Sequence, residues 1–147
     1  MKDFYEKINC EIPKKYMKRI CEKYNLKCVK LFRATALIGD GYGLIISIGM
    51  FESYVSYLQK QGEECLEFLC DNYFTERYDD ADRVNLLEGE GDVYVRNSLT
   101  IVANGLESKW SDVLAGDTKW LEDYKKSRWY DVRKLPEDDM KKIRKYI

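Results

Sequence analysis

Apolar residues recur at helical spacing soon after the start of the chain. Pro13 is followed by KKYMKRICEKYNL, in which the apolar positions fall on one stripe: Tyr16, Met17, Ile20, Cys21 and Tyr24. This spacing predicts a helix, because proline suits the first helical turn. Lysine and arginine occupy most other positions, so the predicted helix is amphipathic with a basic outer face.

The next apolar segments favour strands. Residues 28–36, CVKLFRATA, alternate in part, and residues 44–48, LIISI, are rich in β-branched side chains. Three glycines lie between them on alternate positions: Gly39, Gly41 and Gly43. A dinucleotide-binding loop needs G-x-G-x-x-G spacing and a following helix, whereas here the spacing is G-x-G-x-G and a strand follows. The glycines therefore predict the tip of a β-hairpin that spans about residues 28–48.

Helical spacing returns after Met50 on both sides of Gly62. The first stripe is Phe51, Tyr54, Val55 and Leu58, and the second is Leu66, Leu69, Cys70 and Tyr73. We predict two antiparallel helices joined at Gly62, since glycine is a common helix stop. The outer face of the second helix is acidic.

Residues 93–103, VYVRNSLTIVA, begin with the alternation of a strand and continue with the spacing of a helix. We predict a short strand that passes into a helix, although Gly105 would cost that helix about 1 kcal/mol relative to alanine. Asp117 or Thr118 begins a further helix, and Leu135-Pro136 opens the last one. The expected fold is a single α+β domain over residues 1–147, mainly helical, with the hairpin at about 28–48 and a small strand region near 84–103.

Composition agrees with one soluble domain. The chain has 147 residues, of which 45% are apolar and 35% charged. No apolar run approaches the length that crosses a bilayer, and the first residues lack the apolar core of a secretory signal, so we expect a cytoplasmic protein without membrane association. The five cysteines include no Cys-x-x-Cys pair, which favours free thiols over a zinc site. We expect no metal or cofactor.

The chain contains no histidine. This absence excludes serine–histidine and cysteine–histidine catalysis, histidine-ligated metals and a histidine general base. We therefore expect a non-enzymatic protein. One enzymatic alternative is a histidine-free, metal-dependent hydrolase, because Asp92, Glu107 and Lys109 follow the order of a nuclease pattern in which carboxylates bind a metal and activate water.

Charge is segregated along the chain. Residues 1–33 contain ten basic and four acidic residues, residues 34–92 contain three and thirteen, and residues 93–147 contain twelve and nine. The acidic middle could be neutralised by the basic ends, or it could face a basic partner. The candidate partner-binding residues are Glu63, Glu64, Glu67, Asp71, Asp79, Asp80, Asp82, Glu88 and Glu90. The leading hypothesis is an inhibitor or regulator, of the immunity or anti-defence kind, that neutralises a nuclease toxin or a nucleic-acid-binding defence protein.

A second hypothesis is a nucleic-acid-binding module. Residues 119–134 interleave tryptophan and tyrosine with lysine and arginine, a combination that can stack on bases and neutralise phosphates. With the basic first helix, the candidate contacts are Lys14, Lys18, Lys125, Lys126, Arg128 and Trp129. The competing interpretation is that the tryptophans fill the core. An exposed aromatic surface would also suit a homodimer.

Overall fold

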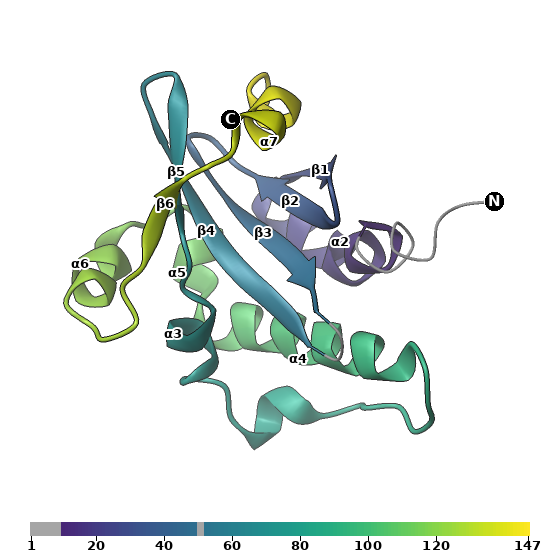
Figure 1. Ribbon diagram of the computed structural model, residues 1–147. Coiled ribbons are helices and arrows are strands. Elements are labelled where there is room, and N and C mark those ends of the chain that lie inside the picture. The colour runs from purple at the N-terminus through teal and green to yellow at the C-terminus, as the bar shows by residue number, and fades with distance from the viewer. Residues whose placement is uncertain (1–9, 50–51) are drawn as a thin grey trace.

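A single antiparallel sheet organises the protein. The computed structural model describes residues 10–49 and 52–147. Six strands lie in the order β1-β2-β3-β4-β5-β6, so each strand pairs with the next one in the sequence (Figure 1). The strands are β1 (Lys27–Leu31), β2 (Ala34–Ile38), β3 (Tyr42–Ile48), β4 (Ser53–Gln61), β5 (Glu64–Phe68) and β6 (Val132–Lys134).

The turns of the sheet use residues that tolerate a positive φ. Gly41 has a φ of 79° between β2 and β3, and Gly62 has a φ of 62° between β4 and β5. The glycine-rich stretch is therefore a hairpin tip, as the sequence predicts. The segment expected as one strand over residues 28–36 is two strands, β1 and β2, because the chain reverses at Phe32 and Arg33, where Arg33 has a φ of 58°.

Helices cover both faces of the sheet unequally (Figure 1). One face carries α2 (Ile12–Tyr24), α3 (Asp71–Thr75), α4 (Val93–Lys109), α5 (Ser111–Leu114) and α6 (Lys119–Lys125), with the 3₁₀ helix η2 (Asp80–Arg83) beside α4. The other face carries α7 (Glu137–Ile143). The predicted first helix is confirmed as α2. None of the helices in residues 10–49 and 52–147 is long and apolar enough to cross a membrane.

An aromatic core fills the space between the sheet and the larger helical layer. Tyr57 of β4 meets Trp120 of α6 edge to face, with ring centroids 4.9 Å apart. Trp110 is fully buried, and its Nε1 donates to the Phe74 carbonyl at 3.0 Å. Of the four tryptophan and tyrosine side chains in residues 119–134, Trp120 and Tyr124 are buried in this core, Trp129 is half-buried against it, and Tyr130 is exposed.

A smaller core lies under α7 on the opposite face. Met140 and Ile143 of α7 belong to the same apolar cluster as Ile45 of β3 and Leu58 of β4. Strand β4 is therefore buried on both faces, with Val55, Ser56, Tyr57 and Leu58 all buried in succession. Covering both faces also removes the alternation that would have marked this strand in the sequence.

Two expectations about the fold are wrong. The domain is α+β, but it is not mainly helical, because the segments on both sides of Gly62 form the hairpin β4–β5 and not two helices. Position 51, which the helical stripe included, lies outside the described residues. The hydrophobic spacing of β4 fits a helix only because both of its faces are buried.

The expectation of a small strand region near residues 84–103 is also wrong. Residues 93–109 form α4 throughout, and the described residues between 84 and 92 contain no strand. Val95, Leu99, Val102 and Leu106 form one buried stripe, so the helical face begins one turn earlier than the sequence suggested.

Candidate functional site

The acidic residues proposed for partner binding occupy several distinct environments. Glu67 is only 4% exposed and faces inward from β5. Its carboxylate accepts a hydrogen bond of 2.5 Å from the Ser56 hydroxyl and one of 2.6 Å from Arg133 Nε. Glu67 therefore ties β4, β5 and β6 together and is not available to a partner.

Three further acidic residues lie around β4 and β5. Asp71 accepts a hydrogen bond of 2.8 Å from the Val55 backbone N–H, and burial raises the pKa of its carboxyl group. Glu64 is exposed and lies 2.5 Å from Lys134 Nζ of the neighbouring strand. Glu63 is exposed at the turn of the β4–β5 hairpin. The β4–β5 turn, beside which Glu63 and Glu64 lie in the sequence, is at the end of the sheet away from the acidic loop that follows α3 (Figure 1).

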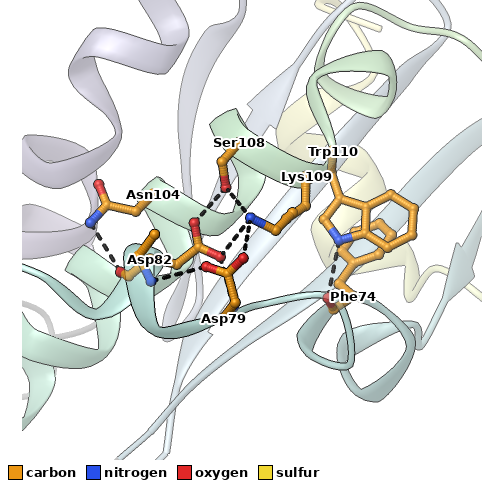
Figure 2. Close-up of polar contacts among 8 residues, drawn as sticks. Phe74, Asp79, Asp82, Asn104, Ser108, Lys109 and Trp110 are labelled. Atoms are coloured by element: carbon orange, nitrogen blue, oxygen red, sulfur yellow. Dashed lines mark hydrogen bonds and ion pairs between the residues drawn. The ribbon is translucent and has the colours of Figure 1, made fainter.

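Asp79 and Asp82 anchor that acidic loop to α4 (Figure 2). The Ser108 hydroxyl donates to Asp82 Oδ1 at 2.5 Å, and the Asp79 backbone N–H donates to Asp82 Oδ2 at 2.9 Å. Asn104 Nδ2 donates to the Asp82 carbonyl at 3.1 Å. Lys109 Nζ lies 3.0 Å from Asp79 and 3.3 Å from Asp82.

The electrostatics of this cluster favour ion pairing over proton transfer. Burial works to raise the pKa of Asp82, but hydrogen bonds from Ser108, Asp79 and Lys109 outweigh it and lower that pKa overall. The hydrogen bond to Asp79 raises the pKa of Lys109 above its usual value. A lysine held in its charged form cannot serve as the base that would activate Ser108. The cluster therefore acts as a structural clamp, and Asp82, only 2% exposed, belongs to the fold.

The exposed part of the loop combines acidic and apolar side chains. Asp80, Glu88 and Glu90 are exposed. Between and beside them lie apolar residues with large exposed fractions: Val84 47%, Leu86 41%, Leu87 53% and Tyr94 50%. We call these seven residues the acidic–apolar surface. Sequence reasoning found its carboxylates but missed its apolar members, because exposure of a leucine has no signature in a single sequence.

Asn97 fixes the apolar part of this surface to α4. Its Nδ2 donates to the Leu87 carbonyl at 2.9 Å, and its Oδ1 accepts from the Leu87 N–H at 2.8 Å. Tyr94 lies three positions before Asn97 on the same helix, and residues spaced in this way are neighbours on a helix surface. The Leu87 segment and Tyr94 therefore adjoin each other.

The basic candidates form two separate groups. Lys14 and Lys18 are exposed on α2, which contacts β1 and β2 at one edge of the sheet. Lys125 and Lys126 are exposed at the end of α6, at the opposite side of the molecule (Figure 1). The two groups do not join into one basic surface.

Arg128 and Trp129 follow α6 and contact each other. The Arg128 guanidinium lies 4.4 Å from the centroid of the half-buried Trp129 ring, and one of its nitrogens lies 3.8 Å from Glu76. This arrangement occupies one face of the indole ring with a cation. It leaves less of that ring for stacking on a base than the sequence suggested.

The residues of the hydrolase alternative do not meet. Asp92 precedes α4, whereas Glu107 lies near its end, about 22 Å away along the helix axis at 1.5 Å per residue. Asp92 pairs with Arg96, and Glu107 pairs with Arg19 of α2. Within residues 10–49 and 52–147, no group of three or more histidine, cysteine, aspartate or glutamate residues is arranged to hold a metal ion.

Comparisons with known proteins give no further guidance on function. No protein family, no curated protein and no solved structure matches this chain.

Proposed function

We propose that this protein acts by binding a basic protein through the acidic–apolar surface. The observation that carries the proposal is that exposed leucine, valine and tyrosine side chains lie among the carboxylates of a loop that is clamped to α4. Acidic groups steer a basic partner and set specificity, whereas buried apolar contacts supply most of the affinity. A surface with both properties fits a protein partner better than it fits a small molecule.

The clamps prepare this surface for binding. The loop is fastened near its start by the Asp82–Ser108 hydrogen bond and in its middle by the Asn97–Leu87 pair. Since the loop is held in place before binding, less conformational entropy is lost when a partner docks. A segment that serves only to interact with water would need neither these two clamps nor several exposed apolar side chains.

The proposed biological role is inhibition or regulation. A partner whose nucleic-acid-facing site is basic, such as a nuclease toxin or a nucleic-acid-binding defence protein, has the charge that Asp80, Glu88 and Glu90 complement. Occupying that site would block access of nucleic acid. The protein itself then needs no catalytic group, in agreement with the structural role of the Ser108–Lys109 cluster.

The proposal is tested by capture from native cells followed by reconstitution. The tagged protein should retain a basic protein in stoichiometric amount and without nucleic acid, as judged by mass spectrometry and by absorbance at 260 and 280 nm. The purified pair should then bind directly, and association should slow as salt is raised. Retention of nucleic acid without a protein companion would instead support the nucleic-acid-binding alternative, whose affinity should fall steeply with salt.

A further inference from the structure

Two cysteines that the proposed function does not use meet where α2 ends and β1 begins. Cys21 lies in the last turns of α2, and Cys28 is the second residue of β1. Asn25 has a φ of 55°, and the Leu26 N–H donates to the Cys21 carbonyl at 2.9 Å, so the helix ends in a tight left-handed turn. This turn brings the two side chains to the same part of the molecule, where both line one pocket.

A pocket opens onto this thiol pair. Its volume is about 440 Å³, and its lining includes both cysteines and three lysines of α2: Lys14, Lys15 and Lys18. Glu11 and Glu22 also line it, so the charged lining is net positive. Both thiols are half-buried, whereas Cys10, Cys65 and Cys70 are buried. Within the described residues, Cys21 and Cys28 are therefore the cysteines that a reagent in solvent reaches most easily.

The nearness of the two thiols makes them chemically different. The neighbouring Cys21 thiol is the main cause that lowers the pKa of Cys28 to about 7, and the positive charges of Lys14 and Lys27 lower it further. The neighbouring Cys28 thiol, together with burial, raises the pKa of Cys21. A low-pKa thiolate beside a second thiol is the arrangement found in sites of thiol–disulfide exchange.

We propose that Cys28 and Cys21 form a redox site that reacts with small, carboxylate-bearing disulfides of the glutathione class. The Cys28 thiolate attacks one sulfur of the small disulfide, whose S–S bond breaks and releases one thiolate, leaving a mixed disulfide on Cys28. Cys21 then loses its proton to solvent and attacks Cys28 Sγ, releasing the second small thiolate. The products are a Cys21–Cys28 disulfide and two small thiols, so two electrons pass from the protein to the oxidant.

The lysines select the charge of the oxidant. Lys14, Lys15 and Lys18 line the approach to the thiols, and they attract carboxylates. Replacing Lys15 and Lys18 with glutamine should slow the reaction with oxidised glutathione by about two- to threefold for each charge removed, since each interaction is worth about half a kcal/mol across 8 Å of water. The reaction with the uncharged hydroxyethyl disulfide should keep its rate.

The test uses the reduced full-length protein and oxidised glutathione. Mass spectrometry should show a product lighter by two hydrogens, and peptide mapping should join residues 21 and 28. The Cys21→Ala variant lacks the second thiol, so it should stop at a glutathione adduct on Cys28. A Cys65→Ser variant, which alters a buried thiol of the smaller core, should react like the wild type.

Alkylation kinetics provide an independent readout. In the wild type, the rate of Cys28 alkylation by iodoacetamide should rise with a midpoint near pH 7. In Cys21→Ala the midpoint should move toward the usual value of about 8.5. The rate at pH 7 should then fall about threefold, after allowance for the greater nucleophilicity of a less acidic thiol. The proposal is overturned if no Cys21–Cys28 disulfide forms, or if Cys28 alkylates no faster than Cys21.

Discussion

The side chain of Asn97 in α4 hydrogen-bonds both backbone polar groups of Leu87. It accepts from the Leu87 N–H at 2.8 Å and donates to the Leu87 carbonyl at 2.9 Å. The pair places a leucine that is 53% exposed at a fixed position beside the helix. The central feature of the protein is therefore an exposed apolar segment that the fold supports from within.

Replacing Asn97 with alanine should loosen this segment. The Leu87 amide would lose its acceptor, and one hydrogen bond is worth about 1 kcal/mol, so its hydrogen exchange should accelerate about fivefold to tenfold. Exchange of the amides in β3 should not change. Unaltered exchange at Leu87 would show that Asn97 does not hold the segment in solution.

Replacing Asp82 with alanine should destabilise the whole domain. The change leaves the Ser108 hydroxyl and the Asp79 N–H without their acceptor and removes an ion pair of Lys109. We expect urea unfolding to show a loss of about 2 to 3 kcal/mol. Asp80→Ala, an exposed neighbour in the same 3₁₀ helix, is the matched control and should change stability by less than about 0.5 kcal/mol.

The Asp82 clamp should also respond to pH. The pKa of Asp82 is lowered in the folded state, so its contribution to stability is fully present above the unfolded value of about 3.9 and is lost as pH falls through the folded pKa. The stability difference between wild type and Asp82→Asn should therefore be constant from pH 5 to 7 and shrink below pH 4. A difference that stays constant down to pH 2 would contradict the lowered pKa.

Gly105 lies in the middle of α4 because the ring of Tyr78 packs against it. A methyl group at this position would overlap the Tyr78 ring. Gly105→Ala should therefore destabilise the protein by about 1 to 3 kcal/mol, even though alanine favours a helix. In a Tyr78→Ala background the same change should stabilise it by about 1 kcal/mol, and destabilisation in both backgrounds would refute the packing explanation.

Gly105 also shows what a single sequence can and cannot reveal. The sequence alone shows that a glycine here lowers the stability of a helix. The reason for the glycine is the ring of Tyr78, which lies 27 positions earlier in the chain. Elements with local signals were predictable. Pro13 is the second residue of α2, within its first turn, and the glycine-rich stretch forms the turn between β2 and β3. Gly62 was ambiguous because a helix end and a hairpin turn both favour positive φ.

The candidate site was predictable in part for the same reason. Charge is visible in the sequence, so the acidic segment was found, but burial depends on contacts between distant residues. Glu67 is paired with Arg133, and Asp82 with Ser108, across separations of 66 and 26 positions. Such pairings remove both carboxylates from the surface, and no local sequence pattern predicts them.

Three forms of the tagged protein, compared in capture from native cells and in binding of the purified partner, show whether the acidic–apolar surface is the interface. The first is the wild type, the second carries Leu87→Ser and Glu88→Lys in the acidic–apolar surface, and the third carries Glu63→Lys at the β4–β5 turn. The β4–β5 turn lies at the far end of the sheet from α4 and the loop beside it (Figure 1), and Glu63 in that turn is also exposed and acidic, so it controls for charge alone.

We expect the second form to lose affinity by at least tenfold, since apolar contacts at the centre of an interface each contribute about 1 to 2 kcal/mol, and the third form to bind like the wild type. Each form should show the same unfolding midpoint, because the altered side chains are exposed. Equal binding of the same basic protein by all three forms would contradict the assignment of the interface to the acidic–apolar surface.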